Sequence, residues 1–472
     1  MTENIRPSGS NLDFALVGHN FFAFLLSIGL LKRGKKVLVL DDDRFNYGDF
    51  FTNSLTALDV EFLKAWGGES DLAPLANIEQ YLTPSKVYFF VGKKQVVLGD
   101  SPHRNFRELC RKFPELFQSN TTEKGLFSYE NEIVNFDNIY NDFCQKVSVL
   151  IFNEKNSAKM STLFEKSIPD TLKSNFNFFF SHFDNKDKLA EAEKYDFNAL
   201  MFMTRGFFQN RLSVSGSKAE LMHLFFSLIS PYYKLDHDRL IADLLKYHME
   251  KGGEFKKLNL SDLKFQSGLV TSFELESFDG IIKPNKMAFI GGYPVGLPIK
   301  LKTTSSASYN CLHVEFEFKE NLPALLENKK CVFTSPIKIG TDRPFWEVYF
   351  SGKKAVFNII MAKKEGTKID FIYERVKNLL IEDLHYLFPE YELDVLDCKM
   401  KFTLDVFIED KDFLAHKRVD STLKKKLVEV LEDSAPLFMS KLKNVLYFGP
   451  YNEDSLGTFS SLVEIKRWRE SL

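Results

Sequence analysis

The chain has 472 residues, of which 44% are hydrophobic and 27% charged, and its formal net charge is -2 at pH 7. This length exceeds the size at which one core usually stops growing, and this composition excludes a disordered chain. We therefore expect two folded domains. The near-balanced charge gives no basic surplus and argues against a nucleic-acid partner.

The first eleven residues are polar and predict a flexible tail, and the segment after them reads as strand, turn, helix and strand. An apolar run at 14–17 ends at Gly18, an apolar helix is expected over 21–31, and a second apolar run at 37–40 ends at Asp41. This is the outline of a dinucleotide-binding βαβ unit. The helix N-terminus would face a pyrophosphate, and Asp41 would accept hydrogen bonds from a ribose.

The glycine positions of this motif are occupied by Gly18, Asn20 and Ala23. Asn20 places a side chain where bare backbone usually faces the pyrophosphate. A membrane segment or secretory signal over 12–31 is a weaker interpretation, because its uninterrupted apolar part is shorter than the roughly 20 residues that span a bilayer. An ordinary βαβ unit without nucleotide stays open as an alternative.

The cysteine and histidine patterns indicate no metal site. The five cysteines are scattered and form no CxxC pair, which argues against a disulfide framework and a zinc site and favours a cytoplasmic location: Cys110, Cys144, Cys311, Cys331 and Cys398. The nine histidines include no HExxH spacing. The tightest cluster, at 236–238, we interpret as a solvated loop rather than a ligand set.

Further along the chain the periodicity predicts a hairpin, a helical region and then mixed helices and strands. The predicted elements are a hairpin at 87–91 and 95–98, a helix over 106–117 interrupted at Pro114, helical structure over 137–205, helices at 221–229 and 240–249, strands at 254–260, 269–276, 287–290, 311–318, 345–361 and 444–448, and helices at 369–387 and up to Arg469. Phenylalanine is abundant, at 48 residues. We favour a core-filling role for these rings over a pocket for a long apolar ligand, which stays possible.

In this order, the pieces resemble the FAD-dependent amine oxidase and phytoene desaturase superfamily, whose relatives include the Rab GDP-dissociation inhibitors and Rab escort proteins. Four places carry the resemblance: the spacing from Gly18 to Asp41, the RFNYG sequence at 44–48, the glycine-containing segments between 215 and 291, and residues 444–461. No single motif is strong, but their order and spacing along the chain are more specific than any one of them.

The resemblance implies an α/β fold in which an FAD-type Rossmann domain is interleaved with an α+β substrate domain. The Rossmann domain would comprise residues 12–75, 210–295 and 430–472, and the substrate domain residues 76–209 and 296–429, after a flexible tail at 1–11. The implied cofactor-binding residues are Gly18, Asn20, Ala23, Asp41, Arg44, Gly48, Gly449 and Gly457. No catalytic residue is assigned, because the flavin would carry the redox chemistry.

The departures from the family pattern are Asn20, Tyr47 in the second glycine pair, and Pro450 in place of the acid that touches the cofactor. Two hypotheses follow. The first, to which we lean because this class dominates the superfamily, is an FAD-dependent oxidoreductase with a degenerate cofactor site, acting on an apolar or amine substrate. The second is a non-catalytic protein that has lost FAD and binds a lipid, an isoprenoid, another apolar small molecule or a protein partner. An NAD-dependent dehydrogenase leaves the middle and C-terminal matches unexplained.

Overall fold

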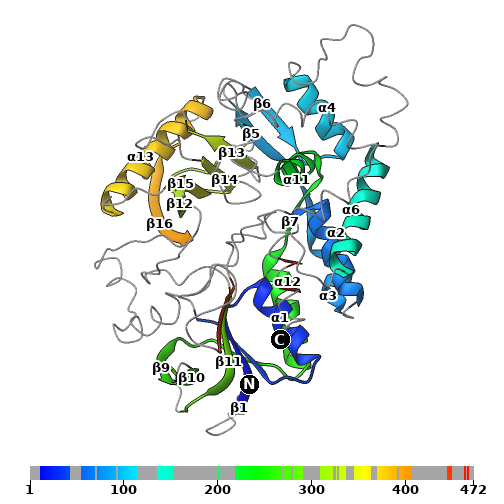
Figure 1. Cartoon of the computed structure of the whole chain (residues 1–472). Helices are drawn as coiled ribbons and strands as arrows, with labels where there is room; N and C mark the ends of the chain where they lie inside the picture. Colours follow the sequence, from blue (N-terminus) through cyan, green and yellow to red (C-terminus); the bar gives the residue numbers. More distant parts are fainter. Residues whose placement is uncertain are drawn as a thin grey trace.

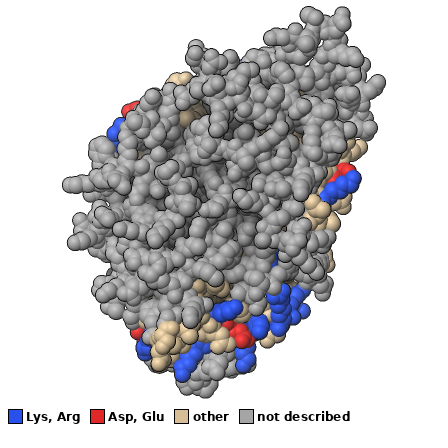
Figure 2. All heavy atoms as spheres, viewed as in Figure 1, with Lys and Arg blue, Asp and Glu red and all other residues tan. Residues whose placement is uncertain are grey.

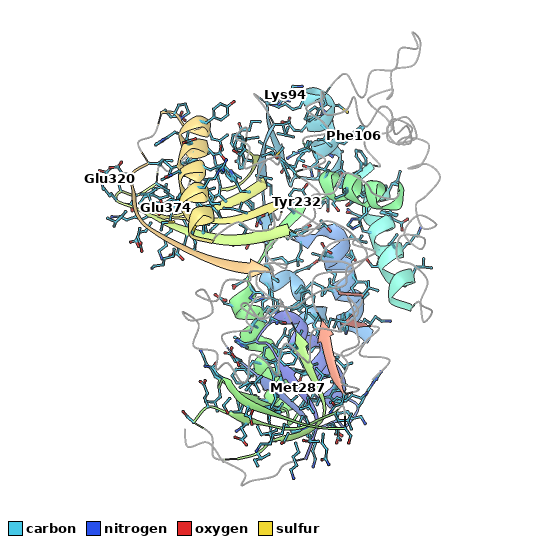
Figure 3. All side chains as sticks on the ribbon, turned by 60° about the vertical axis from the view of Figure 1, so that its left-hand side comes forward. Lys94, Phe106, Tyr232, Met287, Glu320 and Glu374 are labelled. Carbon is cyan, nitrogen blue, oxygen red and sulfur yellow. The ribbon has the colours of Figure 1, made fainter. Side chains whose placement is uncertain are left out.

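The computed structural model describes residues 11–42, 55–69, 72–91, 94–113, 136–153, 200, 203, 218–267, 269–277, 280–290, 309–322, 326, 329–335, 345–362, 369–390, 393–404, 444–448, 462–463 and 465–466. A parallel sheet lies at one end of the molecule and a larger mixed sheet at the other, with a group of helices beside the mixed sheet (Figure 1). Figure 3 shows Met287 at the parallel-sheet end and Glu374 at the opposite end.

The parallel sheet has the strand order β17–β11–β1–β2–β8. Its strands are β1 (Asn11–Val17), β2 (Val37–Leu40), β8 (Glu254–Lys256), β11 (Lys283–Ile290) and β17 (Val445–Phe448). Every neighbouring pair is parallel, so segments from the start, the middle and the end of the chain form one sheet. The predicted α/β class with a Rossmann-type parallel sheet is confirmed, whereas the residue boundaries of the two domains stay a prediction.

Both faces of this sheet are covered, which explains why its strands read as continuous apolar runs. On β2, Val37 and Val39 join the core that contains α1 (Phe21–Leu31) and α12 (His237–Glu250), while Leu38 and Leu40 join a second core. The antiparallel pair β9 (Leu260–Gln266) and β10 (Leu269–Leu275) supplies the other side of that second core. The parallel sheet is therefore the middle layer of three.

A buried histidine joins three of these elements. The Ser27 hydroxyl on α1 donates to Nδ1 of His248 on α12 at 2.7 Å, and His248 Nε2 donates to the Glu254 carbonyl on β8 at 2.9 Å. Because the carbonyl can only accept, Nε2 carries the proton. Burial lowers the pKa of His248, which keeps the imidazole neutral. A Cβ at Gly253 would overlap the imidazole, so the glycine before β8 is needed for this packing.

The second sheet is seven-stranded and mixed, with the order β16–β12–β15–β14–β13–β5–β6. Its strands are β5 (Val87–Val91), β6 (Lys94–Leu98), β12 (Tyr309–Phe318), β13 (Lys330–Thr334), β14 (Phe345–Ser351), β15 (Lys354–Ala362) and β16 (Val395–Leu404). Helix α13 (Ile369–Leu387) packs on one face, where Asp383 accepts hydrogen bonds from Ser335 Oγ at 3.0 Å and Trp346 Nε1 at 2.8 Å. Burial raises the pKa of Asp383 to about 6.

The remaining described elements pack around a three-stranded sheet with the order β3–β7–β4. They are β3 (Leu55–Thr56), α2 (Ala57–Glu69), α3 (Ala73–Ala76), η2 (Ile78–Tyr81), β4 (Leu82–Ser85), α4 (Pro102–Lys112), α6 (Phe136–Asn153), α11 (Lys218–Ile229) and β7 (Tyr232–Leu235). Aromatic rings fill this core, as in the Phe143–Phe226 pair with centroids 4.9 Å apart. The phenylalanine runs at 176–180 and 207–208 lie outside the described residues.

Some sequence predictions differ from the observed elements. The helix expected over 106–117 begins at Pro102 and ends at Lys112, because proline fits the first turn of a helix, where no intrahelical N–H bond is lost. The strand expected over 345–361 is the two strands β14 and β15, joined by a turn at Gly352. Asp236, assigned to a loop, is the N-cap of α12 and accepts from Arg239 N at 3.3 Å.

Among the described residues, no helix is both long and apolar enough to cross a membrane. The same residues contain no group of three or more His, Cys, Asp or Glu side chains placed to hold a metal ion.

Replacing Gly18 by alanine should be far more costly than replacing Gly34. Both glycines have positive φ, +139° and +75°, but a Cβ at Gly18 would overlap the Ile290 carbonyl oxygen, whereas nothing lies within 4 Å of a Cβ at Gly34. We expect Gly18→Ala to lower the free energy of unfolding by about 2 to 4 kcal/mol and Gly34→Ala by about 1 kcal/mol. Urea unfolding of both variants measures the difference, and equal losses would contradict the close approach of β11.

Buried His223 on α11 should make stability sensitive to acid. Burial lowers the pKa of His223 from its usual 6.5 to about 3. Below pH 6.5 the unfolded chain therefore binds a proton at this histidine that the folded chain does not bind. The free energy of unfolding keeps its full value above pH 6.5 and is about 2 kcal/mol lower at pH 5. Burial raises the pKa values of Asp59 and Asp383 to about 6. These two groups therefore increase the free energy of unfolding as the pH falls from about 6 toward 3.8, which opposes the effect of His223.

The variant His223→Phe separates these effects, because it removes the imidazole and keeps both carboxyl groups. We expect its unfolding free energy to rise relative to that of the parent protein by about 2 kcal/mol between pH 7 and pH 5. Urea unfolding at the two pH values gives this difference, and any packing change at pH 7 cancels in it. A constant difference between the two proteins would show that His223 titrates normally.

Candidate nucleotide site at the β1–α1 turn

The predicted nucleotide site lies at the carboxyl edge of the parallel sheet, where β1 turns into α1. The structure brings together Gly18, Asn20, Ala23 and Asp41 at this edge, beside the end of β11. The other predicted cofactor residues, together with Tyr47 and Pro450, lie outside the described residues: Arg44, Gly48, Gly449 and Gly457. The described residues therefore comprise the pyrophosphate and ribose positions of the motif.

Gly18 serves the packing of strands at this edge. Its N–H donates to the Leu40 carbonyl at 2.9 Å, and the Ile290 carbonyl at the end of β11 lies where a Cβ would be. The requirement for glycine at the first motif position thus follows from the approach of β11 to the turn, with or without a ligand.

Asn20 fills the position where the motif leaves bare backbone. It is the N-cap of α1, and its Oδ1 accepts from the Ala23 N–H at 3.0 Å. Its Nδ2 donates to the Ile290 carbonyl at 2.7 Å, and its side chain is completely buried. The carboxamide therefore joins the positive end of the helix to the end of β11 and satisfies a helix N–H that an anion could otherwise bind.

Asp41, the predicted ribose ligand, faces a histidine from the same turn. His19 Nδ1 lies 3.5 Å from Asp41 Oδ2, and the Asp41 side chain is 5% exposed. The imidazole packs against Phe24 and Phe255, with centroid distances of 5.6 and 5.3 Å. The next residue, Asp42, accepts from Leu260 N at 2.9 Å and belongs to the structure of the sheet.

These contacts do not fit a dinucleotide in the pose that the motif implies. The Asn20 carboxamide already accepts the hydrogen bond from the Ala23 N–H at the N-terminus of α1. If the carboxamide moved away, the Ile290 carbonyl would present a hydrogen-bond acceptor to the phosphate, which needs a donor. A ribose would also have to displace His19 from Asp41. The frame of a nucleotide site is present, but its described contacts are made by the chain itself.

Sequence reasoning missed three residues of this site: His19, Phe255 and Ile290. His19 could have been noticed, since it stands inside the glycine motif one residue before Asn20. Phe255 and Ile290 carry no such signal, because β8 and β11 reach the turn only through the order of strands in the sheet. The Ile290 contact in addition involves a backbone carbonyl, which any residue could supply.

Comparisons with known proteins give structural similarity only. No family model matches the chain, and no curated protein matches it. An oxidoreductase from Methanosarcina mazei aligns with 98% of this chain and 100% of its own, at 11% identity and a TM-score of 0.48. A Rab GDI from Plasmodium falciparum aligns over 98% of both chains at 12% identity and a TM-score of 0.43.

A glycerol-3-phosphate dehydrogenase from Bacillus halodurans, solved in complex with FAD, aligns with 96% of this chain at 9% identity and a TM-score of 0.43. The alignment spans only 63% of the dehydrogenase. At TM-scores below 0.5, these similarities say nothing about what the present chain binds.

Replacing Asn20 by aspartate tests the contact to β11. Aspartate caps helices as well as asparagine does, but an ionised carboxylate cannot donate to the Ile290 carbonyl. We expect Asn20→Asp to lower the free energy of unfolding by about 1 to 3 kcal/mol at pH 7. The loss should shrink as the pH falls toward 4, because a protonated carboxyl group can donate.

The reverse exchange on α12 is the matched control. Asp236 caps that helix through one hydrogen bond to Arg239 N, so Asp236→Asn should change the unfolding free energy by less than about 0.5 kcal/mol. If the two exchanges cost the same in urea unfolding, the bridge from Asn20 to β11 contributes nothing special.

Proposed function

We propose that the protein is a non-catalytic binding protein built on a flavoprotein-type fold, in which its own side chains replace the contacts of a dinucleotide. The observation that carries the proposal is the buried Asn20 carboxamide between the N-terminus of α1 and the end of β11. In this state the protein needs no cofactor to satisfy the turn. The fold would then serve as a rigid frame for a binding surface elsewhere.

The energetic argument rests on what FAD would have to displace. Moving Asn20 aside breaks two buried hydrogen bonds, and the phosphate could replace only the one from Ala23 N. The Ile290 carbonyl would stay without a donor, at a cost of about 1 to 3 kcal/mol, and would repel the phosphate. Freeing Asp41 from His19 adds to this cost. These terms favour the protein without dinucleotide.

The ligand in this proposal is an apolar small molecule, a lipid, an isoprenoid or a protein, held by the seven-stranded mixed sheet. The face of that sheet opposite α13 supports such a role with a set of largely buried polar side chains. Glu347 accepts from Asn358 Nδ2 at 2.7 Å and lies 3.4 Å from Lys330 Nζ. The side chains of Lys330 and Glu347 are 13% and 12% exposed, and Asn358 as a residue is 9% exposed. A few fixed polar groups beside an apolar core can orient the polar end of a ligand.

The second candidate is an FAD-dependent oxidoreductase of the amine oxidase or phytoene desaturase type, acting on an apolar or amine substrate. The retained frame favours it: the N-terminus of α1 follows β1 directly, and Asp41 stands at the carboxyl end of β2. FAD, if bound, would supply the redox chemistry. The residues that would hold it in the described region are Gly18, Ala23 and Asp41, after rearrangement of Asn20 and His19.

The absorbance spectrum of the purified full-length protein separates the two candidates. We expect a colourless protein that takes up no FAD at micromolar concentration and releases no flavin fluorescence on denaturation. The variant Asn20→Gly frees the Ala23 N–H for a phosphate but leaves the Ile290 carbonyl unpaired, so it should quench the fluorescence of added FAD weakly, yet measurably more than the parent protein does. Asn77→Gly, a substitution of an asparagine outside the site, should behave like the parent protein.

A yellow parent protein with stoichiometric flavin would overturn the binding-protein proposal in favour of the oxidoreductase. Equal FAD affinity in the parent protein and in Asn20→Gly would show that the carboxamide is no barrier.

A further inference from the structure

The opposite edge of the parallel sheet carries a concentration of positive charge. We call it the basic edge and define it by Lys32, Arg33, Lys35, Lys36, Lys246, Lys251, Lys283 and Lys286. The register of the strands places three of its segments side by side. Lys36 immediately precedes β2, Lys286 on β11 lies level with Phe14 of β1, and Phe14 lies level with Val37, the first residue of β2.

The ends of two helices complete the basic edge. Lys32 after α1 and Lys251 after α12 both lie over the ring of Tyr247, with Nζ at 5.7 and 5.2 Å from the ring centroid. These cation–π contacts hold the two helix ends together and fix the position of both ammonium groups. The basic edge is thus one surface formed by α1, α12, β2 and β11.

Acidic side chains in the same segments do not balance this charge. Near the edge they are Asp13, Glu250 and Glu254, and the Asp13 carboxylate already accepts from Lys36 N at 2.9 Å and from Asn285 Nδ2 at 3.3 Å. Asp238 and Asp243 lie farther toward the start of α12, and Asp243 accepts from the Tyr81 hydroxyl at 2.6 Å. In the described part of the chain, Lys35, Lys36, Lys246 and Lys283 form no ion pair. Lysines elsewhere do pair with carboxylates, as in Lys64, Lys86, Lys146, Lys264, Lys319 and Lys354. Figure 2 shows blue spheres, with fewer red ones among them, at the lower end of the view, where the parallel sheet lies.

We propose that the basic edge docks the protein reversibly on a membrane surface rich in anionic lipid. All but one of its charged residues are lysines. Lysine is a compact, hydrated charge that suits diffuse attraction to a charged surface, whereas recognition of a single phosphate usually employs the planar fork of arginine. Each basic residue near an anionic leaflet contributes about 1 kcal/mol, so a set of this size is enough for measurable association.

Two further observations favour a lipid surface over nucleic acid. The Tyr247 ring is occupied by Lys32 and Lys251, so it is not free to stack on a base. Met249, near the end of α12 between Lys246 and Lys251 in sequence, is 51% exposed. An apolar side chain beside lysines is typical of surfaces that enter the interfacial region of a bilayer.

The basic edge and the nucleotide site lie at opposite ends of the same strands. Membrane docking through the basic edge therefore leaves the β1–α1 turn accessible to solution and does not depend on whether FAD binds there. A failure of membrane binding would therefore leave the proposed function untouched, and the reverse also holds.

Flotation of the full-length protein with vesicles tests the proposal. We expect binding to phosphatidylcholine vesicles that contain about 30% phosphatidylserine at about 100 mM NaCl, and loss of binding at about 500 mM NaCl, where the Debye length is shorter. The double variant Lys35→Glu/Lys36→Glu should bind at least about tenfold more weakly, because two attractive charges become repulsive. Circular dichroism verifies that the variant is folded.

The matched control is Lys353→Glu/Lys377→Glu, which makes the same change of net charge in the turn between β14 and β15 and on α13. This variant should bind like the parent protein. Equal weakening by both double variants would reduce the effect to net charge and overturn the proposal. Binding to pure phosphatidylcholine at the same strength, or binding to duplex DNA but not to anionic vesicles at about 100 mM NaCl, would also overturn it.

Discussion

One side-chain amide decides how the carboxyl edge of the parallel sheet works. Asn20 accepts from the first turn of α1 and donates to the last carbonyl of β11, and both bonds are buried. A helix N-terminus and a strand end usually leave an unsatisfied donor and an unsatisfied acceptor at such an edge. The neutral carboxamide carries a donor and an acceptor and so supplies both partners at once. The turn is thereby complete without a ligand.

The surrounding structure depends on the same closure. Gly18 permits β11 to approach the turn, and His19 extends from the turn toward Asp41 while packing on Phe24 and Phe255. Farther along α1, the neutral imidazole of His248 joins α1, α12 and β8 through two more buried hydrogen bonds. Buried polar groups of this kind are satisfied by each other, which fixes the positions of α1 and of the strands around it.

The two ends of the parallel sheet therefore differ in character. At the carboxyl edge, the buried carboxamide of Asn20 satisfies both the Ala23 N–H and the Ile290 carbonyl. At the amino edge, lysines extend from several segments with few acids among them. A fold that usually uses its carboxyl edge for ligand binding thus gathers basic side chains from four described elements at the other edge.

The sequence by itself determined the class of fold and the elements with a clear hydrophobic period. The helices at 21–31 and 369–387 and the strand at 37–40 follow from local patterns, since burial on one or both faces leaves a direct mark on residue type. The sequence predicts the ends of the strands and the start of α4 less exactly, because caps and turns depend on single hydrogen bonds. Asn20 was recognised from the sequence as a departure from the motif.

Only the tertiary structure decided what Asn20 does. Its hydrogen-bond partner on β11 lies 270 positions away in the chain, and that partner is a backbone carbonyl with no residue-specific signal. The same holds for the basic edge, whose lysines come together only through the parallel register of β1, β2 and β11. Local sequence records which residues prefer to be buried, whereas contacts between remote segments are set by strand order, which no local pattern encodes.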